Sequence, residues 1–352
     1  MAEKREKRWA YCIMVAHFLF LSGAVFAHEC PEGRVLVCGT VLPSDPPPLQ
    51  GDRFPRLGGM KIGTPQNYDS PAIQQGLAKL DVVVVGFGAR FPVATMEEII
   101  KDIIRLNPKI KLYDYVIIDS IHKSNPTLSD IRAMAAERNW YLTSDDGARV
   151  SHEGDGGWAG NISIPAYTEW MARRYHAKKW EDIPSLTGVF VDNVFWRPRV
   201  TGNWQGGAPG YRRGYVHHFT TLRALMPTKP VIGNIGDWGR PEAVVPEYNG
   251  VLDGGYLEHY IGASWSRETA GTTAMMDSYR KVASKVGETL IFNMRGNATD
   301  YKTFRYGLAS ALVGGDAYFD FSAEGEGSIY NPKVSWFDEY DLAGQGTSKW
   351  LG

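Results

Sequence analysis

The sequence predicts a single α/β domain of the (β/α)8 barrel class, the TIM barrel. From residue 56 onward, short runs rich in Val and Ile alternate with amphipathic stretches, as in β–α units around a parallel sheet. Eight such apolar runs are present, which is the number of strands in this barrel. No Gly-rich phosphate-binding turn follows the first run, as an open dinucleotide-binding sheet would require. We therefore expect one closed barrel with its active site on the loops that follow the strands.

The composition is that of a globular protein, with 43% hydrophobic residues, 22% charged residues and a net charge of -1 over 352 residues. No basic run follows the first eight residues, so the charge pattern excludes a nucleic-acid partner. Aromatic residues are the main bias, with 11 Trp and 18 Tyr, several of them in expected loops. Aromatic faces pack against sugar rings, so this bias favours a carbohydrate substrate. The alternative is that a large barrel uses these rings in its core.

Residues 1–27 have the pattern of a signal peptide. Basic residues among the first eight precede an apolar stretch that ends in Val25, Phe26 and Ala27. We expect cleavage after Ala27, which predicts a secreted, periplasmic or cell-envelope protein with no stable membrane insertion after cleavage. An uncleaved anchor is the alternative, because the apolar run is near the lower limit of about 17–20 residues for spanning a bilayer.

A Pro-rich linker, residues 28–55, is expected between the signal peptide and the barrel. It contains Cys30 and Cys38, the cysteines that remain after cleavage. An oxidising compartment would allow these two to form a local disulfide, and we expect that pairing. The barrel itself is expected to occupy residues 56–352.

The eight expected strands are short apolar runs bounded by polar or turn residues. In chain order they cover residues 56–63, 81–87, 109–118, 186–195, 229–238, 250–260, 288–295 and 316–322.

The expected helices are amphipathic stretches between these strands, with a looser helix between the fifth and sixth strands. They cover residues 71–80, 95–106, 128–138, 212–225, 273–286 and 301–313. A long insertion, residues 139–185, separates the third and fourth strands and carries several Trp residues. We expect this insertion to form one wall of the cleft.

The ends of the fourth and sixth strands each deliver an acidic residue. Buried apolar residues lead directly into Asp192 in the fourth strand, and Glu258 follows an apolar position in the sixth. A carboxylate at the end of a buried strand is costly unless it is solvated, paired or used. These strands are separated by one neighbour, so the two acids can face each other at the roughly 5–10 Å that glycoside hydrolysis uses. We predict Asp192 and Glu258 as the catalytic pair.

Each acid also has a structural alternative. A hydrogen bond to the following loop would explain Asp192, and an ion pair with Arg295 or an exposed loop position would explain Glu258.

Polar and aromatic residues at other strand ends predict the substrate-binding groups. Amides, an arginine and aromatic rings together are typical of hydroxyl recognition. The expected set is Asn193, Trp196, Asn234, Asp237, Trp238, Tyr256, Arg295 and Asp320. We expect sugar platforms at Trp158, Trp196, Trp204 and Trp238 and a structural role for Trp170. No spacing typical of metal ligands stands out, so we expect no metal and no cofactor.

Several segments resemble a known group of barrel proteins. They are VFVDNV at 189–194, GGYLEHY at 254–260, YKTFRYGLASAL at 301–312, AYFD at 317–320 and WFDEYD at 336–341. These segments are similar to the barrel glycoside hydrolases called hypothetical glycosyl hydrolase family 15, a resemblance that covers about residues 56–352. More distantly, the acids after the fourth and sixth strands are similar to those of α-galactosidase-type and polygalactosaminidase-like barrels. That similarity implies Asp192 as nucleophile and Glu258 as acid/base, with Asp338 and Glu339 as competing acids.

Taken together, the sequence predicts a glycoside hydrolase that acts on a polysaccharide or envelope glycan through two carboxylates. A non-catalytic carbohydrate-binding barrel is the alternative, because binding needs the aromatic rings and amides but not two opposed acids. A lyase or amide hydrolase is a third hypothesis, which the absence of a nucleophile elbow disfavours.

Overall fold

The computed structural model describes eleven stretches of the chain. They are residues 55–62, 68–86, 93–152, 156–181, 183–239, 250–261, 271–284, 286–287, 289–314, 317–325 and 330–343. All of them belong to one compact unit, Leu49–Ser348. Residues 1–54, which include the predicted signal peptide and the Cys30 and Cys38 pairing, lie outside the described residues. Residues 240–249, where the looser helix was expected, lie outside them too.

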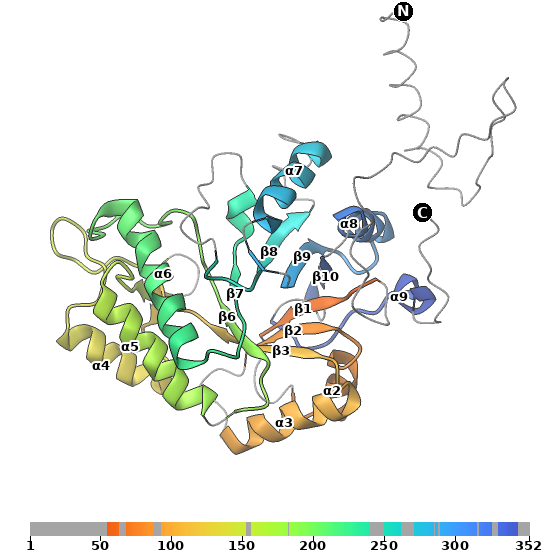
Figure 1. Ribbon diagram of the computed structural model, residues 1–352, viewed down its shortest axis with the longest axis horizontal. Coiled ribbons are helices and arrows are strands. Elements are labelled where there is room, and N and C mark those ends of the chain that lie inside the picture. The colour runs from red at the N-terminus through yellow and green to blue at the C-terminus, as the bar shows by residue number, and fades with distance from the viewer. Residues whose placement is uncertain are drawn as a thin grey trace, which may run out of the picture. The chain divides into compact units, whose positions relative to one another are not determined.

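Eight parallel strands form the sheet of a (β/α)8 barrel, as the sequence predicts (Figure 1). In the described part of the chain they pair in the order β1-β2-β3-β6-β7-β8-β9-β10. The two ends of the sheet meet where Leu57 bridges Phe319 in parallel, which closes the barrel. The strands are β1 (Gly58–Lys61), β2 (Val82–Val85), β3 (Lys111–Val116), β6 (Gly188–Val191), β7 (Val231–Asn234), β8 (Gly254–Ile261), β9 (Thr289–Gly296) and β10 (Tyr318–Ala323).

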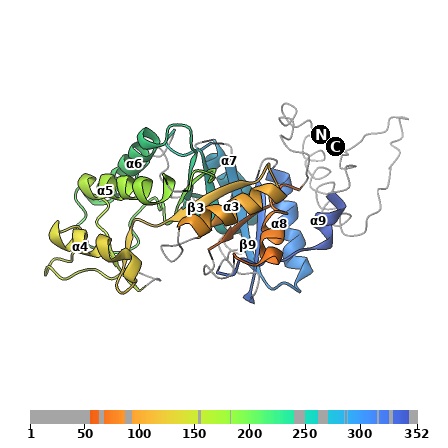
Figure 2. The same cartoon turned by 90° about the horizontal axis from the view of Figure 1, so that it is seen from below.

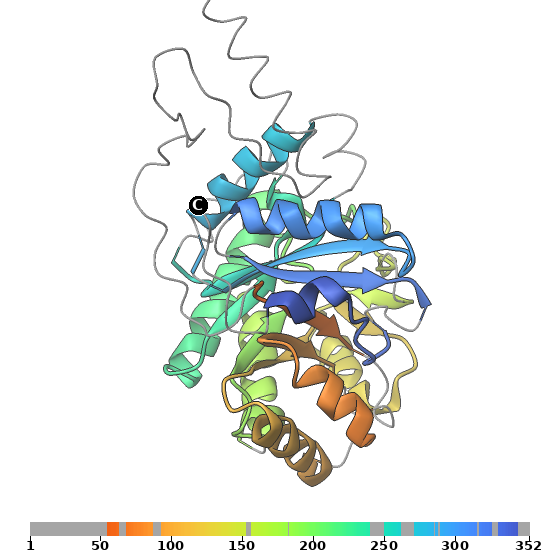
Figure 3. The same ribbon diagram turned by 90° about the vertical axis from the view of Figure 1, so that its right-hand side faces the viewer.

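Helices connect these strands on the outside of the sheet. Figure 3 shows α8, in blue, along the outer face of β9 and β10, and the two strands contact that helix. Among the described residues, no helix is both long enough and apolar enough to cross a membrane. The helices are α2 (Pro71–Leu77), α3 (Val93–Leu106), α4 (Ser129–Glu137), α5 (Pro165–Tyr175), α6 (Gly207–Leu225), α7 (Gly271–Ala283), α8 (Tyr301–Gly314) and α9 (Asp338–Ala343).

The insertion between the third and fourth barrel strands has its own structure. Two short strands, β4 (Ser120–His122) and β5 (Gly157–Ala159), pair antiparallel. The helix α5, which contains the expected helix residue Trp170, packs beside α6 (Figure 2). Trp170 lies in α5 with its ring centroid 5.7 Å from that of Trp140. The ring is partly buried against the core, so Trp170 has the structural role that we expected.

Side chains inside the barrel follow the period of two that a β-strand imposes. One apolar layer fills the interior and is separate from the larger core between sheet and helices. Its residues are Met60, Val82, Val84, Tyr113, Phe190, Ile232, Tyr256, Ile291 and Tyr318. Two residues further along these strands the inward positions turn polar, at Tyr115, Asp192, Asn234, Glu258, Asn293 and Asp320. Because all strands run in one direction, these polar groups collect at the carboxyl ends of the strands.

Candidate active site

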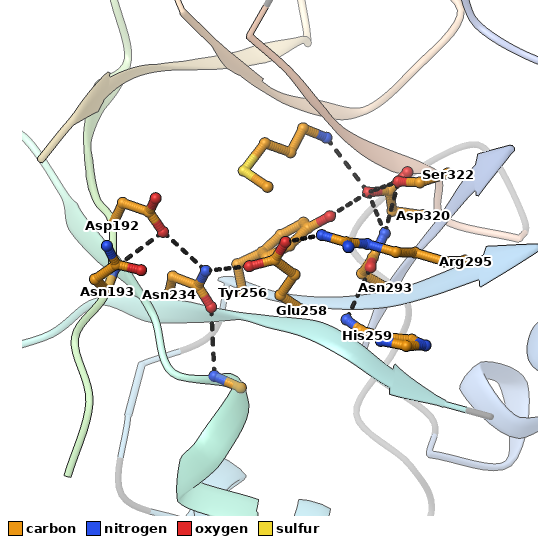
Figure 4. Close-up of polar contacts among 12 residues, drawn as sticks. Asp192, Asn193, Asn234, Tyr256, Glu258, His259, Asn293, Arg295, Asp320 and Ser322 are labelled. Carbon is orange, nitrogen blue, oxygen red and sulfur yellow. Dashed lines mark hydrogen bonds and ion pairs between the residues drawn. The ribbon is translucent and has the colours of Figure 1, made fainter. Parts of the chain in front are cut away.

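The two predicted catalytic acids are joined by one amide group. Asn234 Nδ2, at the end of β7, donates to Asp192 Oδ1 at 2.8 Å and to Glu258 Oε2 at 2.7 Å (Figure 4). The two carboxylate oxygens therefore lie no further apart than these hydrogen bonds laid end to end, about 5.5 Å. The structure thus brings together three of the residues that the sequence singles out.

The backbone turns sharply after Asp192, and this turn fixes the carboxylate. Asn193 has φ 56°, in the left-handed region where Asn is one of the better tolerated residues. Its amide N–H donates to Asp192 Oδ1 at 2.8 Å, and its carbonyl accepts from Tyr215 Oη at 2.7 Å. The hydrogen bond to the following loop, which was the structural alternative for Asp192, is therefore present beside the contact with Asn234.

An irregularity in β8 positions Glu258. The register with β9 shifts between Leu257 and Ile261, and His259 has φ 49°. The His259 amide donates to Asn293 Oδ1 at 2.9 Å instead of continuing the ladder. Such a bulge re-aims a side chain at the end of a strand, which leaves Glu258 free to reach across to β7.

Glycine is required where the turn after β7 meets this bulge. A Cβ added to Gly236 would lie 2.9 Å from the Glu258 carbonyl oxygen and 3.1 Å from its amide nitrogen. Both neighbours are backbone atoms, so neither can move aside cheaply. The close approach holds Asn234 and Glu258 on adjacent strands in a fixed relation.

Asp192 is half-buried and accepts from three hydrogen-bond donors. Tyr115 Oη donates to its Oδ2, while Asn193 and Asn234 donate to its Oδ1. Burial raises the pKa of the Asp192 carboxyl, and the charge of Glu258 raises it further, although the three hydrogen bonds oppose both effects. Burial also raises the pKa of the Tyr115 hydroxyl, so this group stays protonated and keeps donating.

Glu258 lies closer to solvent and pairs with a cation. The Arg295 guanidinium, from β9, contacts Glu258 Oε1, and the exposed fractions of the two side chains are 42% and 26%. The ion pair that was the structural alternative for Glu258 is therefore formed. It occupies one carboxylate oxygen, while Asn234 holds the other next to Asp192.

Asp320 and Tyr256 form a buried floor next to the pair. Asp320 Oδ2 accepts from Tyr256 Oη at 2.6 Å, from Asn293 Nδ2 at 2.9 Å and from the Met60 amide at 3.4 Å. Burial raises the pKa of the Asp320 carboxyl, and the charge of Lys61 opposes that rise. Asp320 and Tyr256 are both buried and bonded to each other, so they support the pair from below, and their contact with substrate stays a prediction.

Trp238 is a sequence-based prediction that the structure contradicts. It lies in η5 (Gly236–Gly239), directly after β7, where a sugar platform was expected. Its side chain is fully buried, and its indole Nε1 donates to the Val194 carbonyl at 2.6 Å. No ring face is left for a sugar, because the indole fills the core beneath the loop. Asp237, in the same turn, is partly exposed.

The other expected platforms are partly exposed and lie at different places. Trp196 follows β6, and its carbonyl accepts from Arg212 at 3.1 Å. Trp158 lies in β5, with the Lys123 ammonium 4.0 Å from its ring centroid. Trp204 lines a cavity on the Asp192 side of the barrel.

This cavity has a volume of about 40 Å³ and contains a polar pair that the sequence did not reveal. Asp119 Oδ2 lies 3.0 Å from His152 Nε2, and Asn193 Nδ2 donates to Asp119 Oδ1 at 3.3 Å. Burial raises the pKa of the Asp119 carboxyl, and the hydrogen bond with His152 opposes the rise. The two residues are 33 positions apart, and only the fold of the insertion brings His152 to the end of the third barrel strand.

The competing acids near the C-terminus lie elsewhere. Glu339, in α9, accepts from Arg305 Nε of α8 at 2.5 Å, outside the sheet. Asp338 is exposed at the start of α9. In the described part of the chain, no group of three or more His, Cys, Asp or Glu residues is arranged to hold a metal ion.

Comparisons with known proteins support the fold but reach no family. No protein-family model matches the chain, and no curated protein is similar to it in sequence. The resemblance to hypothetical glycosyl hydrolase family 15 therefore stays a prediction.

Solved structures with similar folds include several glycosidases. An alpha-galactosidase from Lactobacillus brevis has a TM-score of 0.53 at 9% identity, covering 84% of this chain and 40% of that chain. A GH36 alpha-galactosidase from Geobacillus stearothermophilus has 0.52 at 12% identity, covering 84% and 41%. An alpha-amylase from Lactobacillus plantarum has 0.51 at 8% identity, covering 80% and 75%. Our chain thus spans about two fifths of the two alpha-galactosidases, and at these identities the likeness shows the barrel fold alone.

Proposed function

We propose that the protein is a glycoside hydrolase that uses Asp192 and Glu258 as its two catalytic carboxylates. The observation that carries the proposal is the single Asn234 amide nitrogen bound to both acids at the carboxyl ends of the barrel strands. Two acids held this close repel each other and hold their protons differently, which is the usual basis of acid–base catalysis on sugars. The similar folds of the alpha-galactosidases and the alpha-amylase agree with this proposal.

The separation of the acids favours retention of anomeric configuration. Retaining enzymes hold their carboxyl groups about 5–5.5 Å apart, whereas inverting enzymes need roughly 6.5–9.5 Å to fit a water molecule. The limit of about 5.5 Å between Asp192 Oδ1 and Glu258 Oε2 agrees with the shorter range. Asp192 would then form a covalent bond to the anomeric carbon, which water later hydrolyses.

The surroundings of each acid support its role. Asp192 accepts three hydrogen bonds that stabilise its anion, as a nucleophile needs. Glu258 is 26% exposed and can exchange protons with solvent and with the leaving group, as an acid/base needs. The two roles are coupled, because protonation of Glu258 removes the charge that raises the Asp192 pKa.

The substrate class is proposed from the sequence. Loop aromatics, with the export pattern of residues 1–27, favour a polysaccharide or envelope glycan met outside the cytoplasm. A non-catalytic carbohydrate-binding barrel is the alternative, and it gives no reason for one amide to hold two acids together.

A hydrolysis screen with two matched glutamate variants tests the proposal. The purified protein is assayed on aryl glycosides with good and poor leaving groups, and on polysaccharides by release of reducing ends. Glu258→Gln should slow cleavage most when the leaving group is poor, because a good leaving group departs with little protonation. Glu339→Gln is the control, because Glu339 also pairs with an arginine but lies outside the sheet.

Two results would overturn the proposal. One is a lack of hydrolysis across the screen by folded wild-type protein. The other is an equal effect of Glu258→Gln and Glu339→Gln on every substrate. Nuclear magnetic resonance of the first product formed reads the anomeric configuration, and an inverted product would contradict the retaining mechanism.

A further inference from the structure

Exposed arginines without an acidic partner gather after β6, in the loop and at the start of α6. Elsewhere several arginines pair with an acid on the same helix, as Arg105 and Arg280 do. Within the part of the chain that the structure describes, Arg197, Arg199 and Arg213 form no ion pair, and all three are exposed. These three residues form what we term the arginine surface.

The sequence explains why these cations lack acidic partners. No acidic residue lies between Asp192 and Asp237, although the whole chain carries 39 acidic residues against 38 Lys and Arg. An excess of one charge in a single loop creates a local potential even on a protein whose net charge is -1. The arginines close together in this stretch are Arg197, Arg199, Arg212 and Arg213.

Aromatic rings and a backbone contact hold these side chains in place. The Arg199 guanidinium carbon lies 3.7 Å from the centroid of the Phe195 ring. The Arg197 guanidinium carbon lies 4.9 Å from the centroid of the Trp196 ring. Arg212 Nη1 donates to the Trp196 carbonyl at 3.1 Å, which ties the loop to α6. Donors that are already positioned lose less freedom when they bind an anion.

The loop begins at the catalytic pair and borders the mouth of the barrel. Arg197 is five residues after Asp192, so the two Cα atoms can lie no further apart than about 18 Å. Tyr215 Oη, in α6, donates to the Asn193 carbonyl at 2.7 Å and holds the helix beside the turn that carries Asp192. A polymer of several sugar units can therefore lie over the arginine surface and reach the pair.

The described acids near the loop do not cancel this charge. Asp119 is 5% exposed, and its carboxylate is already held by two donors. The hairpin of the insertion carries Asp145 and Asp146 in its turn, but it also carries the exposed cation of Arg149. Asp146 accepts from Ser144 Oγ at 2.6 Å and from a backbone amide of the same turn at 3.0 Å. The described surface after β6 thus keeps an excess of cations.

We propose that Arg197, Arg199 and Arg213 bind the carboxylate groups of an acidic polysaccharide, so that the substrate contains uronate-type sugars. The inference rests on the proposed function, because a polymer held here is a substrate only if Asp192 and Glu258 cleave it. A planar guanidinium donates two parallel hydrogen bonds to a carboxylate, which a neutral sugar does not offer. A nucleic acid would require a wider basic face than one loop on a protein of net charge -1.

Matched polymers test the charge of the ligand. The inactive Asp192→Asn protein is titrated at low salt, by calorimetry, with polygalacturonate, alginate and hyaluronate, and with the methyl ester of each. At least one carboxylated polymer should bind. Its methyl ester keeps the sugars and linkages without the charge, so it should bind about tenfold more weakly or worse. Added salt should weaken the binding, because it screens exposed charges.

Matched variants test the arginines. Adding Arg197→Gln and Arg199→Gln should weaken the bound polymer about threefold to thirtyfold, because two exposed ion pairs are lost. Adding Arg105→Gln and Arg280→Gln instead removes the same charge from exposed positions on α3 and α7, and this control should bind like the background. Lysine at 197 and 199 keeps the charge without the planar fork, so its affinity should be intermediate. Thermal unfolding shows that each variant is folded, and Arg213→Gln serves if the first pair is not.

Four results would overturn the proposal. The first is a lack of binding of every carboxylated polymer, and the second is equal binding of the methyl esters. The third is equal affinity of the two glutamine double variants. The fourth is tighter arginine-dependent binding of poly(dT) or dextran sulfate than of every carboxylated polymer, which would assign the surface to phosphate or sulfate groups.

The two proposals fail in different ways. Hydrolysis of a neutral glycoside by wild-type protein, with no arginine-dependent binding of a carboxylated polymer, would refute the arginine surface and leave the catalytic pair intact. Arginine-dependent binding of a carboxylated polymer, by a protein that cleaves no glycoside, would refute the catalytic proposal and leave the arginine surface as a binding site.

Discussion

The amide of Asn234 offers the sharpest test of the carboxylate pair. In Asn234→Asp an oxygen replaces the nitrogen that lies 2.8 Å from Asp192 and 2.7 Å from Glu258. At an effective dielectric constant of about 20, an ionised Asp at this position would repel each neighbour by about 6 kcal/mol. The new side chain must therefore hold a proton at neutral pH.

A protonated Asp at position 234 has one O–H, so it can donate to only one of the two acids. The other carboxylate loses a hydrogen bond to a charged group, which is worth about 1.5–3 kcal/mol. Asp192 Oδ1 and Glu258 Oε2 are at most about 5.5 Å apart, so the two acids repel by about 3 kcal/mol or more when both are ionised, and the lost donor makes their double ionisation harder. We expect kcat/KM at pH 7 to fall about 10- to 150-fold.

The pH dependence gives the distinguishing signature. The introduced carboxyl has a folded pKa above its unfolded value of about 3.9, so its folded state disfavours ionisation. The stability that it contributes is present below about pH 4 and is lost as pH rises through the folded pKa. Because the doubly ionised pair is harder to form with one donor missing, the alkaline limb of kcat/KM should shift to higher pH, and the melting temperature should fall further below that of the wild type as pH rises.

A second amide provides the matched control. Asn107 Nδ2 also bridges two acceptors, the carbonyls of Ala78 and Leu80, each at 3.0 Å, away from the two acids. Asn107→Asp should lower stability without moving the pH profile of activity. A profile for Asn234→Asp that parallels the wild type, with a melting difference that does not depend on pH, would refute the bridging role.

Three further outcomes follow from the same contacts. Asp192→Asn should lower turnover about a thousandfold or more, yet raise the melting temperature at pH 7, because burial raises the Asp192 pKa and the amide removes a poorly solvated charge. That gain should shrink as pH falls through the folded pKa and vanish below about pH 3, where the wild-type carboxyl is protonated in both states, and a variant less stable than wild type at pH 7 would contradict it. Arg295→Gln removes the cation that holds Glu258 Oε1, so kcat/KM at pH 7 should fall because the acid loses one of its two positioning contacts; an unchanged kcat/KM would show that the ion pair does not position the acid. Asp320→Ala leaves the Tyr256 hydroxyl without its acceptor and should lower the free energy of unfolding by about 3 kcal/mol in urea titrations, whereas a loss below about 1 kcal/mol would argue against the buried floor.

The barrel was predictable because its strands are local features of the sequence. Each of the eight barrel strands overlaps the apolar run expected for it, and the acids Asp192 and Glu258 are visible because each follows such a run. Position in the chain also shows that these strands are separated by one neighbour. The bridging role of Asn234 was not predictable, because it depends on the bulge that re-aims Glu258.

The residues that sequence reasoning misplaced or missed depend on contacts that the local sequence does not show. Trp238 follows a strand, as a platform would, but a large ring in a short turn gains more from burial than from exposure. His152 was missed because its contact with Asp119 joins segments 33 residues apart, through an insertion whose fold the local pattern does not reveal. The helix α5 inside that insertion has a weak apolar face and begins at Pro165. Its residues therefore show little of the periodicity by which the bounds of a helix are recognised in a sequence.

Alternation along the strands explains why the polar groups meet at one level of the barrel. In the paired register, Asn234 lies opposite Tyr256, and Gly233 lies opposite Val191, the residue before Asp192. Asp192 and Asn234 are therefore level on neighbouring strands, while Glu258 is two residues further along and points the same way. A one-residue slip of β7 would turn Asn234 out of the lumen and leave two acids with no shared donor. The apolar layer below, which includes Phe190, opposes such a slip, because it would expose inward-facing side chains to the helices. The chemistry of the pair thus depends on the packing of the layer beneath it.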